Sequence, residues 1–477
     1  MERTAAVQQN DRTDQAGGSG LTQMDHHNKP IILGGGIAGI AAAIRLAQAG
    51  ARPTLIESRP YLGGRLRSFI HPETGDEIDN GQHLLMGCYH NTLQLLETLG
   101  TRQLVRLQPS LSVQFRNADG TPETFAPIGW LPWRLGVAAG MLRLRQLSLA
   151  ERAGLLRVAV AIATQPPGPT ETAAQYLRRL KQSPRACQRL WDPIIIATLN
   201  TPSEQASAVL FARVMQLAFL AERADSQLGF ASGGLSALHA PARNLIEQHG
   251  GRVIVGTPIT GIELQPTGQC VVRLKEREAI TASQVISALP HAALRNISSP
   301  SIVSHIPSLA QPMPVSPIVS LYLWFNSPLL QLPAFAAMIG TGVQWMFNKR
   351  KIVPAQNAQF PGLISCTISA AVAESATQIS ELVATAVREL RGAFPEMEEA
   401  KLLAWQAIKE KQATFAATPA SEPQRPPTHT SIPGFYLAGD WVATGLPGTI
   451  EGAVQSGFAA AEMLLQQTQS NQKDHYP

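Results

Sequence analysis

The chain has 477 residues, which suits about two or three domains because one domain usually takes about 100–200 residues. Hydrophobic residues make up 44% of it and charged residues only 15%, a composition that excludes a disordered chain. The net charge of +5 is spread along the sequence without basic runs interleaved with aromatic residues. We therefore do not expect nucleic acid as a partner.

The four cysteines lie far apart and include no C-x-x-C pair, which indicates neither a disulfide framework nor a metal site. Residues 1–29 are polar and lack the apolar segment of a signal peptide, so we expect a disordered extension there, and a short tail at 471–477. No apolar run reaches the roughly 18 residues of a membrane-spanning helix. These features predict a cytoplasmic protein and leave contact with the inner face of the membrane open.

The ordered part begins with a predicted βαβ unit: an apolar strand at 31–33, a helix at 37–49 and a strand at 54–57. The turn 34–39 matches G-x-G-x-x-G, in which Gly34 allows the tight turn, Gly36 lets a pyrophosphate approach and Gly39 brings helix and sheet together. Glu57 is expected to accept hydrogen bonds from an adenosine ribose. The candidate cofactor contacts in this unit are Gly34, Gly36, Ile37, Ala38, Gly39, Glu57 and Ser58.

A second glycine turn follows at 62–65 and favours FAD over NAD. Gly63 and Gly64 can offer backbone amides, and Arg65 a guanidinium, to the same phosphates. The alternative is a solvated turn with a surface arginine.

The predicted secondary structure changes in the middle of the chain. A hairpin is predicted over 104–125 with its turn at 117–120, and helical patterns dominate 135–221. The stretch 130–163 combines two tryptophans with an apolar helix whose arginines outnumber its single acid, Glu151, which is typical of an interfacial helix. The alternative is a buried helix pair with a solvated basic face. The basic residues in question are Arg143, Arg145, Arg152 and Arg157.

The later segments carry helix and strand patterns that we assign alternately to two domains. A helix at 235–247 and a strand at 253–255 precede Ile259, another candidate cofactor contact, and strands at 318–325 and 363–371 lead to a helix at 380–390. The sequence therefore predicts an α/β protein in which 30–104, 226–300 and 401–470 form a discontinuous Rossmann-like FAD-binding domain. Residues 105–225 and 301–400 would form an interleaved α+β substrate-binding domain with a helical membrane-facing part.

The segment 434–465 predicts a strand, a loop and a helix that complete the cofactor site. A strand that ends at Gly439-Asp440 can bind the ribityl or phosphate region, and the helix that opens near Glu451 can direct its amides at the flavin pyrimidine ring. The candidate contacts added by the second turn, the middle strand and this segment are Gly63, Gly64, Arg65, Ile259, Gly439, Asp440, Thr449, Ile450 and Ala453.

Several motifs resemble one family. They are Asp-Asn-Gly-Gln-His at 79–83, Gly-Cys-Tyr at 87–89, and the segments 344–347, 409–415, 425–426, 438–441 and 444–453. On these residues the chain resembles the flavin amine oxidase and phytoene desaturase superfamily over nearly all of its ordered length, and within it the hydroxysqualene dehydroxylase family. The resemblance implies a Rossmann-like FAD-binding domain of the amine oxidase (GR2) type and non-covalent FAD. It also implies reductive removal of the hydroxyl of hydroxysqualene to give squalene for hopanoid biosynthesis, with hydride from N5 of the reduced flavin.

Such a reaction needs an acid that helps hydroxide leave as water. The catalytic candidates are His83, Tyr89 and Asp79, with His90 beside them, in a segment expected to pass the isoalloxazine ring. Gly81, Gln82 and His83 are also candidate flavin contacts. The alternative is that this segment only packs on the flavin while His83 binds a backbone carbonyl.

Three other functions remain open. A phytoene desaturase shares a long isoprenoid substrate and differs in the direction of hydride transfer. A flavin amine oxidase usually has an aromatic residue at the position of Thr449, and its absence removes the device that positions an amine. A non-enzymatic scaffold that acts as a partner of a prenyl synthase would show no flavin colour.

Overall fold

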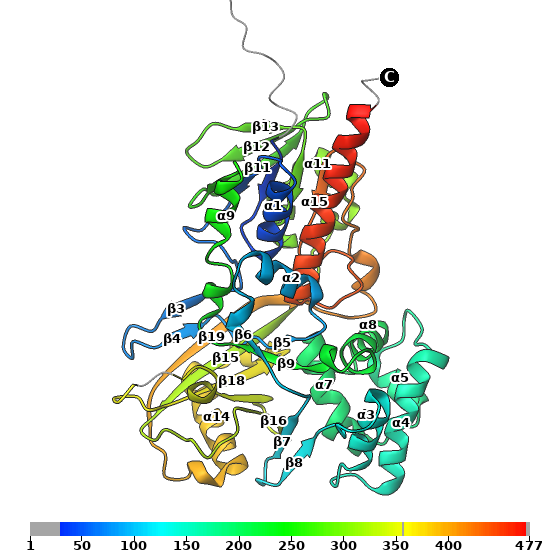
Figure 1. The fold of residues 1–477 in the computed structure, drawn as a ribbon, viewed down its shortest axis with the longest axis vertical. Coiled ribbons are helices and arrows are strands. Elements are labelled where there is room, and N and C mark those ends of the chain that lie inside the picture. The colour runs from blue at the N-terminus through cyan, green and yellow to red at the C-terminus, as the bar shows by residue number, and fades with distance from the viewer. Residues whose placement is uncertain (1–28, 355–356, 474–477) are drawn as a thin grey trace, which may run out of the picture.

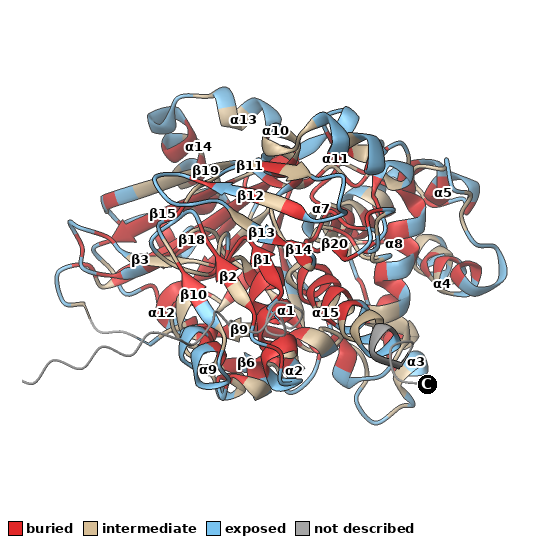
Figure 2. Cartoon of the chain, turned by 90° about the horizontal axis from the view of Figure 1, so that it is seen from above, coloured by how far each residue is buried: buried red, intermediate tan, exposed pale blue. Residues whose placement is uncertain are grey.

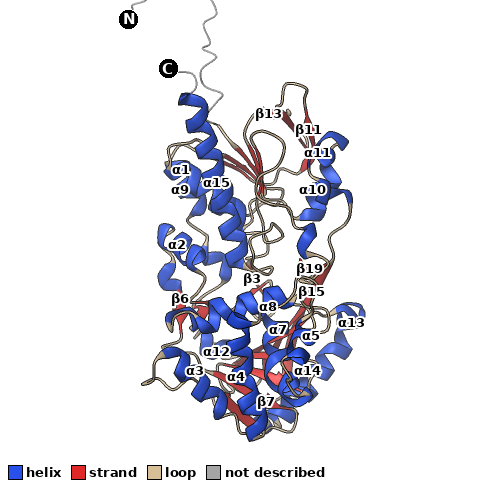
Figure 3. Cartoon of the chain, turned by 90° about the vertical axis from the view of Figure 1, so that its right-hand side faces the viewer, coloured by secondary structure: helices blue, strands red, loops and turns tan. Residues whose placement is uncertain are grey.

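The computed structural model describes residues 29–354 and 357–473. The expected N-terminal extension lies outside the described residues apart from Lys29, as do the last four residues of the tail. Figures 1 and 3 show two lobes stacked along the long axis, with the C-terminal helix in one lobe and a large antiparallel-rich sheet in the other.

A five-stranded parallel sheet forms the centre of the first lobe. Its order is β10-β2-β1-β14-β20, and every neighbouring pair is parallel. The strands are short and almost wholly buried, as expected when helices cover both faces of a parallel sheet. The bounds are β1 Ile31–Leu33, β2 Thr54–Ile56, β10 Arg252–Ile254, β14 Val285–Ser287 and β20 Phe435–Leu437.

Two helices from opposite ends of the chain lie side by side on this sheet: α1 (Ile37–Gln48) and α15 (Ile450–Lys473) (Figure 1). Their close approach depends on glycine. A methyl group on Gly457 of α15 would lie 2.2 Å from the carbonyl oxygen of Ala38, and one on Gly39 of α1 would lie 2.0 Å from that of Gly34. The first helix is thus held against both the sheet and the last helix.

Small elements surround the parallel sheet. An antiparallel sheet, β11-β12-β13, is inserted between β10 and β14, and α9 packs on α1. The pair β3-β4, the sheet β5-β9-β6 and helix α2 lie between the two lobes (Figure 1). The bounds are α9 Ala242–Gln248, β11 Ile259–Leu264, β12 Cys270–Leu274, β13 Ile280–Ala282, β3 Ser68–Ile70, β4 Glu77–Asp79, β5 Leu85–Met86, β6 Val105–Leu107, β9 Leu228–Ala231 and α2 His90–Thr98.

A seven-stranded sheet forms the second lobe, in the order β19-β15-β18-β17-β16-β7-β8. Side chains alternate between its two faces, so that Val319, Leu321 and Leu323 of β15 join an apolar cluster with α14 (Ile379–Ala393). The strand bounds are β7 Val113–Asn117, β8 Pro122–Phe125, β15 Val315–Phe325, β16 Phe335–Ile339, β17 Trp345–Asn348, β18 Gly362–Ser369 and β19 Leu402–Phe415.

A group of helices completes this lobe (Figures 1 and 3). It comprises α3 Trp133–Leu142, α4 Leu149–Thr164, α5 Ala173–Arg179, α7 Asp192–Leu199 and α8 Ala208–Met215. Figure 2 shows exposed segments along α3, α4 and α5, at one side of the molecule. None of the helices in the described ranges is both long and apolar enough to cross a bilayer.

Two expectations about segments need correction. The predicted helix at 235–247 is broken into a 3-10 turn at Leu235–Leu238 and α9, because Pro241 stands at the break and cannot continue a helix. Residues 402–415, placed above with the FAD-binding segment 401–470, form β19 and pair along β15 at the edge of the seven-stranded sheet. The predicted hairpin is present as β7-β8, although its first residues form β6 in another sheet.

Candidate functional site

The first glycine turn has an open side. Gly34 has a φ of +100°, which favours glycine, and a methyl group on Gly36 would meet no atom within 4 Å. The first hydrogen bond within α1 joins the Ile40 amide to the Gly36 carbonyl at 2.9 Å. The amides of Ile37, Ala38 and Gly39 therefore have no helical carbonyl four residues before them, and a helix N-terminus of this kind suits a phosphate.

Glu57 ties this turn to the end of β2. Its buried carboxylate accepts hydrogen bonds from the Gly35 amide at 2.6 Å, the Ser58 hydroxyl at 2.9 Å and the Arg59 amide at 2.8 Å. We predicted that Glu57 binds a ribose, and that role remains a prediction. The contacts give Glu57 a second task that the sequence did not reveal, which is to hold the glycine turn closed.

The second glycine turn stacks on the first. The Gly63 amide donates to the Gly35 carbonyl at 2.8 Å, and a methyl group on Gly64 would lie 3.1 Å from the Cα of Gly36. Beneath it lies buried His239, whose Nε2 donates to the Leu66 carbonyl at 2.8 Å. Burial lowers the pKa of His239, so the imidazole is neutral there. No sequence motif pointed to His239.

Arg65 joins this turn to the C-terminal segment. Its guanidinium binds both carboxylate oxygens of Asp440, at 3.0 and 2.5 Å, and also donates to the Ala413 carbonyl of β19. We predicted that Arg65 faces the phosphates, and that role remains a prediction. The structure places its guanidinium in a bidentate ion pair that connects the second glycine turn, the strand-end aspartate and the edge of the other sheet.

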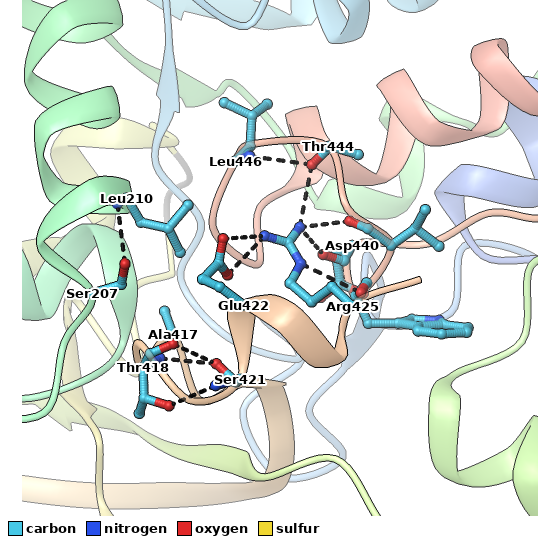
Figure 4. Close-up of polar contacts among 12 residues, drawn as sticks. Ser207, Leu210, Ala417, Thr418, Ser421, Glu422, Arg425, Asp440, Thr444 and Leu446 are labelled. Carbon is cyan, nitrogen blue, oxygen red and sulfur yellow. Dashed lines mark hydrogen bonds and ion pairs between the residues drawn. The ribbon is translucent and has the colours of Figure 1, made fainter. Parts of the chain in front are cut away.

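A buried arginine holds the loop that follows β20 (Figure 4). The guanidinium of Arg425 donates to the Val442 carbonyl at 2.6 Å and pairs with Glu422 at 3.0 Å, while it lies 4.4 Å from the ring centre of Phe415. Weaker bonds reach the carbonyls of Asp440 and Trp441 at 3.4 Å. Arg425 thus fixes the backbone that presents Asp440 to Arg65.

The N-terminus of α15 is joined to α2 by Glu451. The carboxylate accepts bonds from both the backbone and side chain of Asn91, at 3.0 and 2.8 Å, and of Thr92, at 2.9 and 2.7 Å. Thr449 caps α15 itself, because its hydroxyl accepts from the Gly452 amide at 3.1 Å. Ile450 and Ala453 lie in this first turn. The amide of Gly439, whose φ is +133°, donates to the buried Ser456 hydroxyl at 2.7 Å.

Ile259 begins β11, apart from these turns, and its nearest link is Thr257, whose amide donates to the Glu57 carbonyl at 3.0 Å. That link brings the start of β11 to the end of β2.

His83 adopts the alternative arrangement, in which its ring binds a backbone carbonyl. Its Nδ1 donates to the Gly81 carbonyl at 2.9 Å, since a carbonyl can only accept. Burial lowers the pKa of His83, and the charges of Arg65 and Lys349 lower it further, against opposing effects of Gly81 and Asp79. A neutral imidazole with its proton on Nδ1 presents Nε2 as an acceptor, not as an acid.

Asp79 and Gln82 meet a lysine that the sequence analysis did not select. The Lys349 ammonium, 7% exposed, lies 3.2 Å from Asp79 Oδ2 and 3.1 Å from Gln82 Oε1. The other Asp79 oxygen accepts from Ser68 at 2.7 Å and from the Leu235 amide at 3.0 Å. Lys349 lies two residues after the motif 344–347, which was the available signal in the sequence.

Tyr89 and His90 stand where α2 begins. Tyr89 precedes α2, and burial raises its pKa, which keeps the phenol protonated. The His90 ring is 71% exposed and its Nε2 lies 2.7 Å from Asp225. The structure therefore does not bring His90 to the cluster around Asp79.

Known proteins resemble this chain in sequence and in fold. The sequence matches the model of the flavin containing amine oxidoreductases over residues 37–465. Hydroxysqualene dehydroxylase of Rhodopseudomonas palustris is 31% identical over 456 residues, which cover 91% of this chain and 97% of that protein. 15-cis-phytoene desaturase of Narcissus pseudonarcissus is 27% identical and covers 91% of this chain and 79% of its own length. A solved oxidoreductase from Methanosarcina mazei has a TM-score of 0.70 at 16% identity, with 91% of this chain and 100% of that chain covered.

Proposed function

The chain belongs to the family of flavin containing amine oxidoreductases, and from this premise we propose that this FAD-dependent oxidoreductase removes the hydroxyl group of hydroxysqualene to form squalene. The similarity to hydroxysqualene dehydroxylase of Rhodopseudomonas palustris supports the substrate. The observation that carries the chemistry is the buried Lys349, a proton-bearing group held beside the segment 79–83. Supply of squalene for hopanoid synthesis would be the physiological role.

The residues present fit FAD. The open side of Gly36 and the free amides at the start of α1 suit the pyrophosphate, and Glu57 keeps the turn in that shape. Arg65 and Asp440 bring the second turn and the β20 loop to the same place. We assign the rest of the FAD contact surface to the predicted residues of the first turn of α15 and of the segment 81–83.

The reaction breaks the C–O bond, forms a C–H bond and releases water, so it consumes one hydride and one proton. Bound FAD would supply the hydride chemistry once an external two-electron donor had reduced it. Lys349 supplies the proton to the departing oxygen: of its three N–H groups, two face Asp79 and Gln82, and the third has no acceptor in the described part of the chain. Asp79 positions the ammonium, and neutral His83 adds no second positive charge.

The substrate would reach the protein from a lipid phase. Large apolar side chains are exposed before and along α3 and α4, among them Trp130 at 83% and Leu149 at 78%. Arginines accompany them, while the acid of this region, Glu151, is bound by Ser148 and Ser183. We assign this surface, formed by residues 130–164, to contact with an anionic membrane. It is called the α3–α4 surface below.

Anaerobic incubation of the reduced holoenzyme tests the proposal. We expect hydroxysqualene to reoxidise the flavin, followed by its absorbance, with squalene as the extracted product. Phytoene with the oxidised enzyme is the comparison, because the similarity to the Narcissus desaturase supports a hydrocarbon substrate. Flavin reduction by phytoene, without any reaction of hydroxysqualene, would replace the proposal by a desaturase.

A further inference from the structure

One face of the seven-stranded sheet carries a row of polar side chains in an otherwise apolar interior. Ser320 of β15, Thr367 of β18 and Trp345 of β17 lie opposite one another on three adjacent strands. Tyr322 and Ser365 form the next row on the same face. The intervening residues, such as Met346 and Cys366, point to the α14 side.

In the first row, the Thr367 hydroxyl and the Trp345 indole nitrogen lack hydrogen-bond partners among the described residues. In the next row, the Tyr322 hydroxyl lies near the Ser365 hydroxyl and the Asp79 backbone, whose hydrogen bonding lowers its pKa against the effect of burial. Thr367 is 9% exposed, and Tyr322 and Ser365 are fully buried. Buried polar groups are nearly always hydrogen-bonded, so a set of unpaired groups on one face indicates that another molecule satisfies them.

The rows lie next to the segment that carries the proposed chemistry. A methyl group on Gly81 would lie 3.2 Å from the Ser320 hydroxyl, so the backbone of this segment passes directly over the first row. Burial raises the pKa of Tyr322, and the nearby charge of Asp79 raises it further. Lys349 is the first residue after β17. The polar rows therefore lie in the same part of the structure as Lys349 and its partners Asp79 and Gln82.

Aromatic rings adjoin the rows on the other side. The ring centre of Phe335 in β16 lies 6.4 Å from that of Trp345 and 6.3 Å from that of Phe347, and both pairs of rings are stacked. The ring centre of Phe230 in β9 lies 5.2 Å from that of Phe335. The face thus changes from an aromatic patch to a polar row within two strands. An amphiphile with a long hydrocarbon chain and one hydroxyl is divided in the same way, into an apolar part and a polar part.

We propose that Thr367 and Trp345 form a binding subsite for the hydroxyl group of an isoprenoid alcohol, with the aromatic patch holding the adjacent hydrocarbon. This inference rests on the proposed function and adds a specificity determinant to it. The Trp345 N–H donates to the substrate oxygen, and the Thr367 hydroxyl accepts from or donates to it. A pure hydrocarbon would leave both groups buried and unpaired, so the subsite rejects hydrocarbons and releases squalene once the hydroxyl has gone.

Ligand binding to the oxidised holoenzyme tests the subsite without turnover. Hydroxysqualene and squalene are titrated, and the dissociation constants are read from the perturbation of the flavin spectrum. We expect wild-type protein to prefer hydroxysqualene by about tenfold or more, because a site built for a hydroxyl discriminates strongly against its absence. Thr367→Val, which keeps the shape, should abolish most of this preference, and Trp345→Phe should reduce it. Ile368→Val, on the opposite face of β18, is the matched control and should leave it unchanged.

The outcomes separate this inference from the proposed function. Unchanged preference in Thr367→Val and Trp345→Phe overturns the subsite, even when wild-type enzyme forms squalene, and assigns the unpaired groups to water. A preference that Thr367→Val removes supports the subsite, even when the reduced wild-type enzyme fails to form squalene. No preference for hydroxysqualene in wild-type protein also overturns the subsite.

Discussion

At the scale of single residues, Lys349 has two separable roles. It neutralises buried Asp79, and it carries the proton proposed for the departing oxygen. Lys349→Met leaves the Asp79 carboxylate, 4% exposed, without its counter-ion, which should cost about 3–5 kcal/mol of unfolding free energy. Thermal unfolding of the variant measures this loss.

The double variant Lys349→Met/Asp79→Asn separates the roles. It removes both charges, so most of the stability should return. Squalene formation in single turnover should nevertheless remain about 10²- to 10⁴-fold slower than in wild type, the usual contribution of a positioned acid. Recovery of the rate together with the stability would limit Lys349 to a structural role.

His239 makes the second glycine turn sensitive to acid. Because burial lowers its pKa in the folded protein, the unfolded state binds a proton more readily than the folded state below about pH 6.5. Stability should therefore fall as the pH drops from 6.5 toward the folded pKa, by at most about 1.4 kcal/mol per pH unit from this residue. We expect His239→Gln to lose less thermal stability between pH 7.5 and 5.5 than wild type. An equal loss in both proteins would contradict this assignment.

The sequence singled out candidate site residues but not their hydrogen-bond partners. The motif around 34–39 follows from local geometry, because each glycine answers a constraint within a few residues. Arg65 and Asp440 are far apart in the chain, and their pairing depends on how the last strand joins the sheet. Lys349 and Thr367 were not selected, because the residues they contact lie far away in the sequence; only the nearby motif 344–347 pointed toward Lys349.

At the scale of elements, the contact between α1 and α15 sets the shape of the cofactor site. Gly457→Ala places a methyl group about 2.2 Å from the Ala38 carbonyl, so the helices must separate, at a cost of roughly 1–3 kcal/mol typical of overpacking. The free amides at the start of α1 would shift with the helix. We expect weaker FAD binding, measured by titration of the stripped protein, together with a lower unfolding temperature.

Gly154→Ala in α4 is the matched control. This glycine also lies inside a helix, but the nearest atom to an added methyl is the Gln182 side chain at 3.7 Å. The same substitution should therefore leave FAD binding unchanged and stabilise the helix by up to about 1 kcal/mol. Equal losses at both positions would show that helix packing is not the cause.

Elements with strong local signals were predicted well, and those set by tertiary pairing were not. The βαβ unit, the hairpin β7-β8 and α14 all lie close to the predicted ranges. The strand β19 was assigned to the wrong lobe, because its neighbour in the sheet is β15, far away in sequence. The break before α9 was overlooked although Pro241 marks it.

At the scale of the whole molecule, the chain crosses repeatedly between the lobes, and the proposed chemistry lies where they meet. Arg65 of the first lobe binds the Ala413 carbonyl of the second, and Lys349 of the second binds Asp79 of β4, which lies between the lobes. Cofactor and substrate would thus contact both lobes at once. The α3–α4 surface, to which we assign membrane contact, is exposed on the second lobe (Figure 2).

That surface gives a prediction for the intact protein. Trp130→Glu with Leu149→Glu replaces two highly exposed apolar side chains by acids, so both the apolar contact and the attraction to anionic lipid should weaken. We expect at least about tenfold weaker sedimentation with phosphatidylglycerol-containing vesicles, since each apolar side chain contributes roughly 1.5–3 kcal/mol on full burial. The control, Ile70→Glu with Val372→Glu, changes residues that are 62% and 69% exposed on other elements. Equal weakening by both pairs would mean that net charge, and not the α3–α4 surface, governs the binding to vesicles.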